Sequence, residues 1–172
     1  SMKDFYIIDL YKVFTNLIEK YGIDKNKLRL EITESAFTLD LEKNVNVIKK
    51  LQMFGFIVEM DDFGSGYSSL NTLKDIPVDI LKLDMKFMEK SKNTKRSADI
   101  VQMVVAMADK LGMPVIAEGV ETKEQADFLG RIGCDIIQGY YYAKPMSMEE
   151  FEQLLNKYPY RDIVQKGIGN DI

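Results

Sequence analysis

The sequence contains no histidine, and it contains a single cysteine, Cys134. The absence of histidine excludes serine–histidine triads, histidine general bases and histidine metal ligands. One cysteine excludes an internal disulfide and suits a reducing cytoplasm. Any chemistry must therefore rest on carboxylates, lysine, tyrosine, serine and amides.

Long apolar runs and an excess of positive charge are also missing. No stretch approaches the roughly 20 apolar residues of a membrane span, and we expect no signal peptide and no membrane contact from this segment. The net charge of −4 argues against nucleic acid as a partner. With 46% hydrophobic and 29% charged residues, the chain suits one globular domain in the cytoplasm. We expect that domain to cover residues 3–158, after an expression scar (residues 1–2) and before a loosely held polar tail (residues 159–172).

Short apolar segments alternate with amphipathic helical segments along the chain. Helical spacing predicts a helix over residues 5–20 that ends at Gly22. Strands are predicted at residues 27–32, 56–60, 79–84, 114–119 and 135–139, with helices between and after them. The long helix before residue 112 should bury Met103 and Met107, and Thr122 and Ser147 should cap the last two helices. Five such repeats predict a parallel sheet with right-handed crossovers.

A polar or charged residue lies at or near the carboxyl end of each predicted strand. These residues are Glu31, Asp61 with Asp62, Lys82, Glu118 and Gln138. A (β/α)8 barrel builds its active face from the ends of successive strands, whereas a doubly wound sheet uses one switch point, so the pattern favours the barrel. Complete barrels usually need about 250 residues, so we predict an incomplete TIM-like α/β barrel of about five parallel strands. Its uncovered edge should favour a homodimer or a swapped assembly.

Strand alternation also makes a prediction about the layer beneath the site. If Glu31 and Asp61 point into the barrel, then Arg29 and Glu59, two residues earlier on neighbouring strands, point inward as well. A buried Glu59 without a cation would be costly. We therefore predict that Arg29 and Glu59 form an ion pair.

The strand-end residues together form a site of hard oxygen ligands. Such ligands suit Mg²⁺ or Mn²⁺, and two such ions about 3.5–4 Å apart can clamp a phosphodiester during in-line displacement. An aspartate of the doublet can bridge two ions, and Lys82 can orient a water or stabilise developing charge. Taken singly, each residue has an ordinary alternative. The doublet can be an acidic strand-to-helix turn, Lys82 a surface lysine, Glu118 a helix N-terminal carboxylate and Gln138 a turn amide. Their joint occurrence at five strand ends favours the site.

Five segments, in order and spacing, resemble the EAL domain family. They are residues 28–35, 61–70, 81–84, 116–121 and 138–145. The family consists of bacterial phosphodiesterases that linearise cyclic di-GMP to pGpG on a modified barrel with Mg²⁺ or Mn²⁺. The resemblance implies that Glu31 is a metal ligand, that Asp61 bridges two metals, and that Asp62 and Glu118 serve the second metal.

The same resemblance implies that Lys82 holds the nucleophilic water, that Gln138 lies in its shell, and that Glu34 anchors the glycine-rich loop after Asp62. In the family this loop also touches the dimer partner. Ser65 stands where many members have threonine, which keeps the hydroxyl group.

One departure from the family pattern is large. The Glu-Ala-Leu signature and the asparagine of the following strand do not occur, and we interpret the chain as a truncated member with little or no activity. Two alternatives remain, a catalytically inactive module that binds cyclic di-GMP and a regulatory or dimerisation segment without a ligand. A kinase-like interpretation of residues 62–64 fails because no phosphate loop or His-Arg-Asp loop accompanies them.

Overall fold

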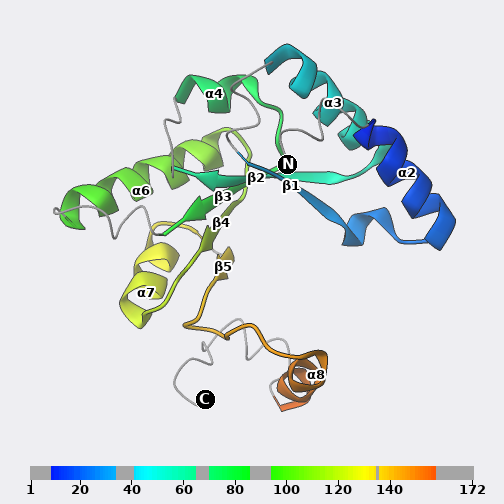
Figure 1. The fold of residues 1–172 in the computed structure, drawn as a ribbon. Coiled ribbons are helices and arrows are strands. Elements are labelled where there is room, and N and C mark those ends of the chain that lie inside the picture. The colour runs from blue at the N-terminus through cyan, green and yellow to red at the C-terminus, as the bar shows by residue number, and fades with distance from the viewer. Residues whose placement is uncertain (1–8, 34–40, 65–69, 86–93, 135, 158–172) are drawn as a thin grey trace.

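The computed structural model describes residues 9–33, 41–64, 70–85, 94–134 and 136–157 (Figure 1). The strands are β1 (Arg29–Thr33), β2 (Ile57–Phe63), β3 (Ile80–Asp84), β4 (Val115–Glu118) and β5 (Ile136–Gln138). The helices are α2 (Leu10–Tyr21), the short 3-10 helix η1 (Lys25–Lys27), α3 (Leu41–Phe54), α4 (Leu70–Asp75), α6 (Thr94–Lys110), α7 (Lys123–Arg131) and α8 (Met148–Lys157). The expected tail, Glu34 and Ser65 lie outside the described residues.

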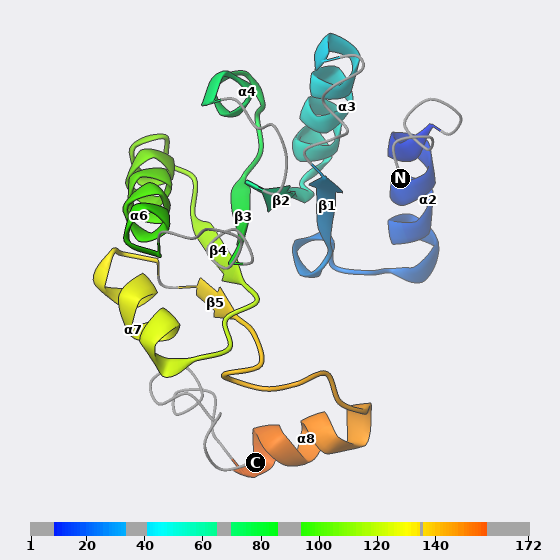
Figure 2. The same ribbon diagram turned by 60° about the vertical axis from the view of Figure 1, so that its left-hand side comes forward.

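The five strands form one open parallel sheet in the order β1-β2-β3-β4-β5. The sheet curves into an arc, and helices α3, α4, α6 and α7 lie along its outer side (Figure 2). This arrangement confirms the prediction of a parallel α/β sheet of about five strands. Helix α8 lies apart from the sheet in both views, and none of its residues is buried.

Helix ends follow the predicted capping residues. Gly22 adopts a left-handed conformation with φ of 60° and ends α2, which begins at Leu10. Residues 5–8 of the predicted helix lie outside the described residues. Thr122 forms a capping box at the start of α7. At α8, the Ser147 hydroxyl accepts from the Glu150 backbone N–H at 3.2 Å while the Glu150 carboxylate accepts from the Ser147 backbone N–H at 2.8 Å. Reciprocal bonds of this kind satisfy backbone donors that the first helical turn leaves unpaired.

The hydrophobic core lies between the outer face of the sheet and the helices. In α6, Val101, Val105 and Ala108 are buried at helical spacing. Met107 packs against this core, but Met103 is 71% exposed, so the prediction that it is buried is wrong. Met103 stands two positions after Val101 and two before Val105, about 200° around the helix, so its side chain must leave on the opposite side.

The helices are short or carry many charges. Over the ranges that the structure describes, no helix is both long enough and apolar enough to cross a membrane.

Candidate active site

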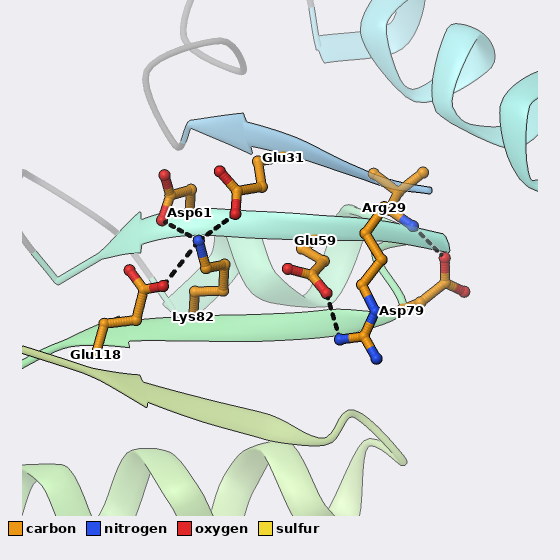
Figure 3. A network of polar contacts seen from close by, with 8 residues as sticks. Arg29, Glu31, Glu59, Asp61, Asp79, Lys82 and Glu118 are labelled. Carbon is orange, nitrogen blue, oxygen red and sulfur yellow. Dashed lines mark hydrogen bonds and ion pairs between the residues drawn. The ribbon is translucent and has the colours of Figure 1, made fainter. Parts of the chain in front are cut away.

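Polar side chains gather on the inner face of the sheet, because alternate residues of each strand point away from the helices. In β1, Leu30 and Ile32 are buried in the outer core, whereas Arg29 and Glu31 occupy the inner face (Figure 3). The same alternation places Glu59 and Asp61 on the inner face of β2. The carboxyl ends of the strands therefore bring several of the predicted site residues to one face of the sheet.

The two aspartates lie in a β-bulge of β2. Met60 pairs with Leu81 and Phe63 pairs with Leu83, so β2 contains one extra residue opposite Lys82. Asp62 takes a left-handed conformation with φ of 59°, which a non-glycine residue rarely adopts. The prediction that the strand ends at residue 60 is therefore wrong, since β2 continues through both aspartates to Phe63. The bulge leaves Asp61 partly buried and Asp62 exposed.

Three carboxylates converge on Lys82, which is 5% exposed. The Lys82 Nζ atom lies 2.5 Å from Glu31 Oε1, 2.9 Å from Glu118 Oε1 and 3.2 Å from Asp61 Oδ1 (Figure 3). The four residues come from β1, β2, β3 and β4, so the site depends on the whole run of strands. This burial excludes the alternative that Lys82 is a surface lysine.

The electrostatics of this cluster shift two pKa values. Burial lowers the pKa of Lys82, but the hydrogen bonds and charges of its carboxylate partners outweigh burial and raise that pKa well above its ordinary value. Burial raises the pKa of Glu118, and the charges of Asp61 and Glu31 add to this while Lys82 opposes it. The ammonium therefore stays charged at neutral pH and holds together carboxylates that repel one another.

A second ion pair lies one layer beneath. Arg29 Nη1 donates to Glu59 Oε1 at 2.8 Å, and Glu59 is 3% exposed, which confirms the predicted pair. Next to it, Asp79 Oδ2 accepts a hydrogen bond from the Val58 backbone N–H at 2.8 Å (Figure 3). Sequence reasoning missed this role of Asp79. The signal was an aspartate directly before a strand, where its side chain can accept from a neighbouring backbone.

Sequence reasoning also missed the role of Gly139, which directly follows β5. A Cβ atom at this position would lie 2.1 Å from the Val120 carbonyl oxygen and 2.3 Å from the Val120 nitrogen. The Val120 N–H donates to the Gln138 carbonyl at 3.2 Å, and the Tyr141 N–H donates to the Val120 carbonyl at 3.0 Å. Gly139 therefore allows the close backbone approach that holds the ends of β4 and β5 together; a glycine directly after a strand was the signal.

The predicted site residues divide into three groups. Glu31, Asp61, Lys82 and Glu118 meet as described. Gln138 lies at the end of β5, in register with Glu118, and is exposed, as is Asp62. Glu34 falls outside the described residues.

The carboxylates suit a divalent cation by their chemistry but not by their present arrangement. Among the described residues, no three acidic side chains stand together as a preformed metal site. Asp61 Oδ1 is nevertheless buried and forms no well-aligned hydrogen bond with any described residue, although Lys82 Nζ lies 3.2 Å away. A buried carboxylate oxygen without an aligned hydrogen bond is a suitable ligand for a hard cation.

The fold and the site together define a barrel-type α/β domain with an acidic, lysine-centred site at the ends of its parallel strands. The family model described as "EAL domain" matches residues 9–145. The chain belongs to the EAL domain family.

Several curated relatives are similar over most of this chain. The cyclic di-GMP phosphodiesterase NbdA of Pseudomonas aeruginosa is 37% identical over 141 residues, which cover 82% of this chain and 18% of NbdA. The cyclic di-GMP phosphodiesterase RocR of the same species is 37% identical over 135 residues, covering 78% of this chain and 34% of RocR. The signaling protein YkoW of Bacillus subtilis is 35% identical, covering 92% of this chain and 20% of YkoW. The chain thus spans between 18% and 34% of the length of these relatives.

Solved structures of the family have the same fold. The PaMucR phosphodiesterase in complex with c-di-GMP has a TM-score of 0.80 at 34% identity, covering 88% of this chain and 61% of that chain. The EAL domain of Mycobacterium smegmatis DcpA has a TM-score of 0.79 at 36% identity, covering 90% and 69%. The manganese/cy-diGMP complex of Klebsiella pneumoniae BlrP1 has a TM-score of 0.76 at 28% identity, covering 84% and 37%.

Proposed function

We propose that this chain is part of a cyclic di-GMP phosphodiesterase that opens one phosphodiester bond of the ring and yields pGpG. The observation that carries the proposal is the meeting of Glu31, Asp61 and Glu118 at the buried Lys82 ammonium, at the strand ends of an EAL domain. The names of NbdA and RocR, and the c-di-GMP bound to the PaMucR phosphodiesterase, support the choice of substrate.

We further propose that two ions of Mg²⁺ or Mn²⁺ bind to Glu31, Asp61, Asp62 and Glu118. The oxygen donors and the buried Asp61 Oδ1 atom support this assignment, and the manganese complex of BlrP1 agrees with it. Bound ions of this kind supply Lewis acidity and lower the pKa of a coordinated water. Asp61 is the residue that we assign as the bridge between the two ions.

The residues of this chain have separate tasks in the proposed reaction. Lys82 orients the attacking water and stabilises the negative charge that develops on the phosphoryl oxygens, because its raised pKa keeps it cationic at neutral pH. Gln138, one strand from Glu118, supplies an amide to the shell of that water. Glu34 anchors the loop after Asp62.

A single-turnover assay tests the proposal with the 172-residue chain. We expect little turnover, because the Glu-Ala-Leu and asparagine strands that the family resemblance implies do not occur in these residues. Excess protein with cyclic di-GMP and Mn²⁺ should still give slow pGpG formation that Lys82→Met abolishes and Lys123→Met does not. Lys123 is the matched control, since it pairs with Asp127 at 2.6 Å on an exposed helix face.

The same assay distinguishes the alternative function. The three carboxylates that Lys82 already holds favour, as a second candidate, an inactive module that binds cyclic di-GMP or serves regulation or dimerisation. Binding of cyclic di-GMP without any pGpG would establish a binding module. Neither binding nor turnover would leave the regulatory or dimerisation segment.

We also propose that the domain extends over residues 3–158, forms a homodimer or swapped assembly, and acts in the cytoplasm. The α8 helix, which runs to Lys157, supports the domain boundary. Exposed apolar side chains on α2 and α8 support association, and the single buried Cys134 is compatible with a reducing compartment.

A further inference from the structure

We infer that Lys82 is a built-in cation that holds the three site carboxylates together, and that this contact and the binding of a divalent ion exclude each other. The inference rests on the proposed function, because it concerns the carboxylates assigned there to the metal. It adds a state in which the site is assembled by its own lysine.

The charge of the cluster favours a cation at its centre. Glu31, Asp61 and Glu118 bring three negative charges into contact with one ammonium, and Lys82 itself is buried. The Glu31 side chain is 54% exposed, but those of Asp61 and Glu118 are mostly buried, and carboxylates this close repel one another unless a cation lies between them. Lys82 supplies this cation, so the strands can come together before any ion binds.

The Lys82 ammonium is also crowded. Three carboxylate oxygens lie within 3.2 Å of its Nζ atom. A water or a phosphoryl oxygen can reach the ammonium only by displacing one of these oxygens. The proposed task of Lys82 in the reaction therefore requires that at least one carboxylate moves away from the ammonium, and a second cation that attracts the carboxylates would cause this movement.

The exchange is confined to one layer of the site. Glu59, beneath the cluster on the same face of β2, has its own cation in Arg29 at 2.8 Å. Lys82 is thus not required to neutralise Glu59. Transfer of the upper carboxylates from lysine to metal leaves the lower pair and the sheet unchanged.

The experiment measures folding and Mn²⁺ binding of the full chain, with and without EDTA, for wild type, Lys82→Met, Lys82→Arg and Lys123→Met. We expect Lys82→Met to bind Mn²⁺ about tenfold more tightly than wild type by calorimetry, because one repelling positive charge is gone. In EDTA its melting temperature should fall below that of wild type, and Mn²⁺ should restore it. Lys82→Arg keeps the cation and should follow wild type in EDTA, as should the exposed control Lys123→Met.

Each possible result either supports the inference or overturns it. A Lys82→Met protein that folds only with Mn²⁺ supports the inference, as does tighter binding in a folded variant. Equal or weaker Mn²⁺ binding, a variant that folds under neither condition, or no Mn²⁺ binding by any protein overturns it. This experiment does not use cyclic di-GMP, so its result is independent of the single-turnover assay. If that assay gives pGpG but Lys82→Met does not change the Mn²⁺ affinity, only this inference is refuted. If the Mn²⁺ affinity changes but the chain does not act on cyclic di-GMP, only the proposed function is refuted.

Discussion

The Arg29–Glu59 pair is asymmetric, since the Arg29 side chain is 49% exposed and that of Glu59 is 4% exposed. Removal of the arginine leaves a buried carboxylate without a partner, whereas removal of the glutamate leaves a cation that can reach water. The two partners should therefore differ greatly in their sensitivity to mutation.

We predict that Arg29→Met lowers the unfolding free energy by about 1–3 kcal/mol, because it leaves Glu59 buried without its partner. Urea denaturation followed by circular dichroism measures the change. The control is the double variant Arg29→Met with Glu59→Met, which should recover most of the loss. A double variant that is less stable than Arg29→Met would contradict this account.

The raised pKa of Glu118 predicts a pH dependence of stability. Because the folded protein holds a proton on this carboxyl more tightly than the unfolded chain does, unfolding free energy should rise as the pH falls from 7 toward the ordinary value of 4.5. The Glu118→Gln variant should lack this contribution in EDTA. The difference between its urea midpoint and that of wild type, compared at pH 7 and pH 5, isolates the contribution of Glu118, with exposed Glu149→Gln as the control. A constant difference would refute the prediction.

Individual contacts were predictable from the sequence only where strand alternation alone decides them. The Arg29–Glu59 pair follows from two strands in register, with Arg29 opposite Ile57 and Glu31 opposite Glu59. The three-way contact at Lys82 was not predicted, because it depends on how far each side chain reaches across a curved sheet. Sequence reasoning placed Lys82 with a water, whereas the structure places it among carboxylates.

At the scale of elements, the end of β5 is held by a contact that only glycine permits. The Gly139→Ala variant should lose about 1–3 kcal/mol of unfolding free energy, because its Cβ would displace the Val120 backbone. Gly130→Ala in α7 is the matched control, since a Cβ there meets nothing within 4 Å and alanine favours the helix. Thermal unfolding of both variants tests this. If Gly139→Ala melts at the same temperature as wild type, the close approach at Gly139 does not contribute to stability.

Element types and caps were predictable, but the course of β2 was not. Thr122 and Ser147 carry local signals that act within one helical turn, so their roles were evident. The bulge at Asp61 and Asp62 is set by pairing with β3, a partner about 20 residues away in the chain. No local pattern distinguishes such a bulge from an acidic turn that follows the strand.

At the scale of the whole molecule, apolar side chains remain on the surface of the last helix. Met148, Phe151 and Leu155 are exposed on α8. The open sheet and its strand count were predictable from the five repeats, because each repeat contributes one strand. What covers these side chains depends on association and lies beyond a sequence pattern.

We predict a dimer in solution, since association removes exposed apolar surface from water. Light scattering after size exclusion should give the mass of two chains at micromolar concentration. Phe151→Glu, at a position that is 48% exposed, should shift the protein toward one chain without loss of helix content. A wild-type protein that is monomeric across that concentration range would contradict the prediction.

The strand order of the sheet equals the strand order of the chain, and this has a consequence for synthesis on the ribosome. Glu31, Asp61, Lys82 and Glu118 emerge in the order in which they lie side by side. A nascent chain that has exposed β3 can already place Lys82 between two carboxylates, and β4 then adds the third. Each new strand pairs with the strand synthesised just before it. The cluster therefore forms without pairing between strands that are far apart in the chain. Translation itself thus delivers the parts of this site in the order of their assembly.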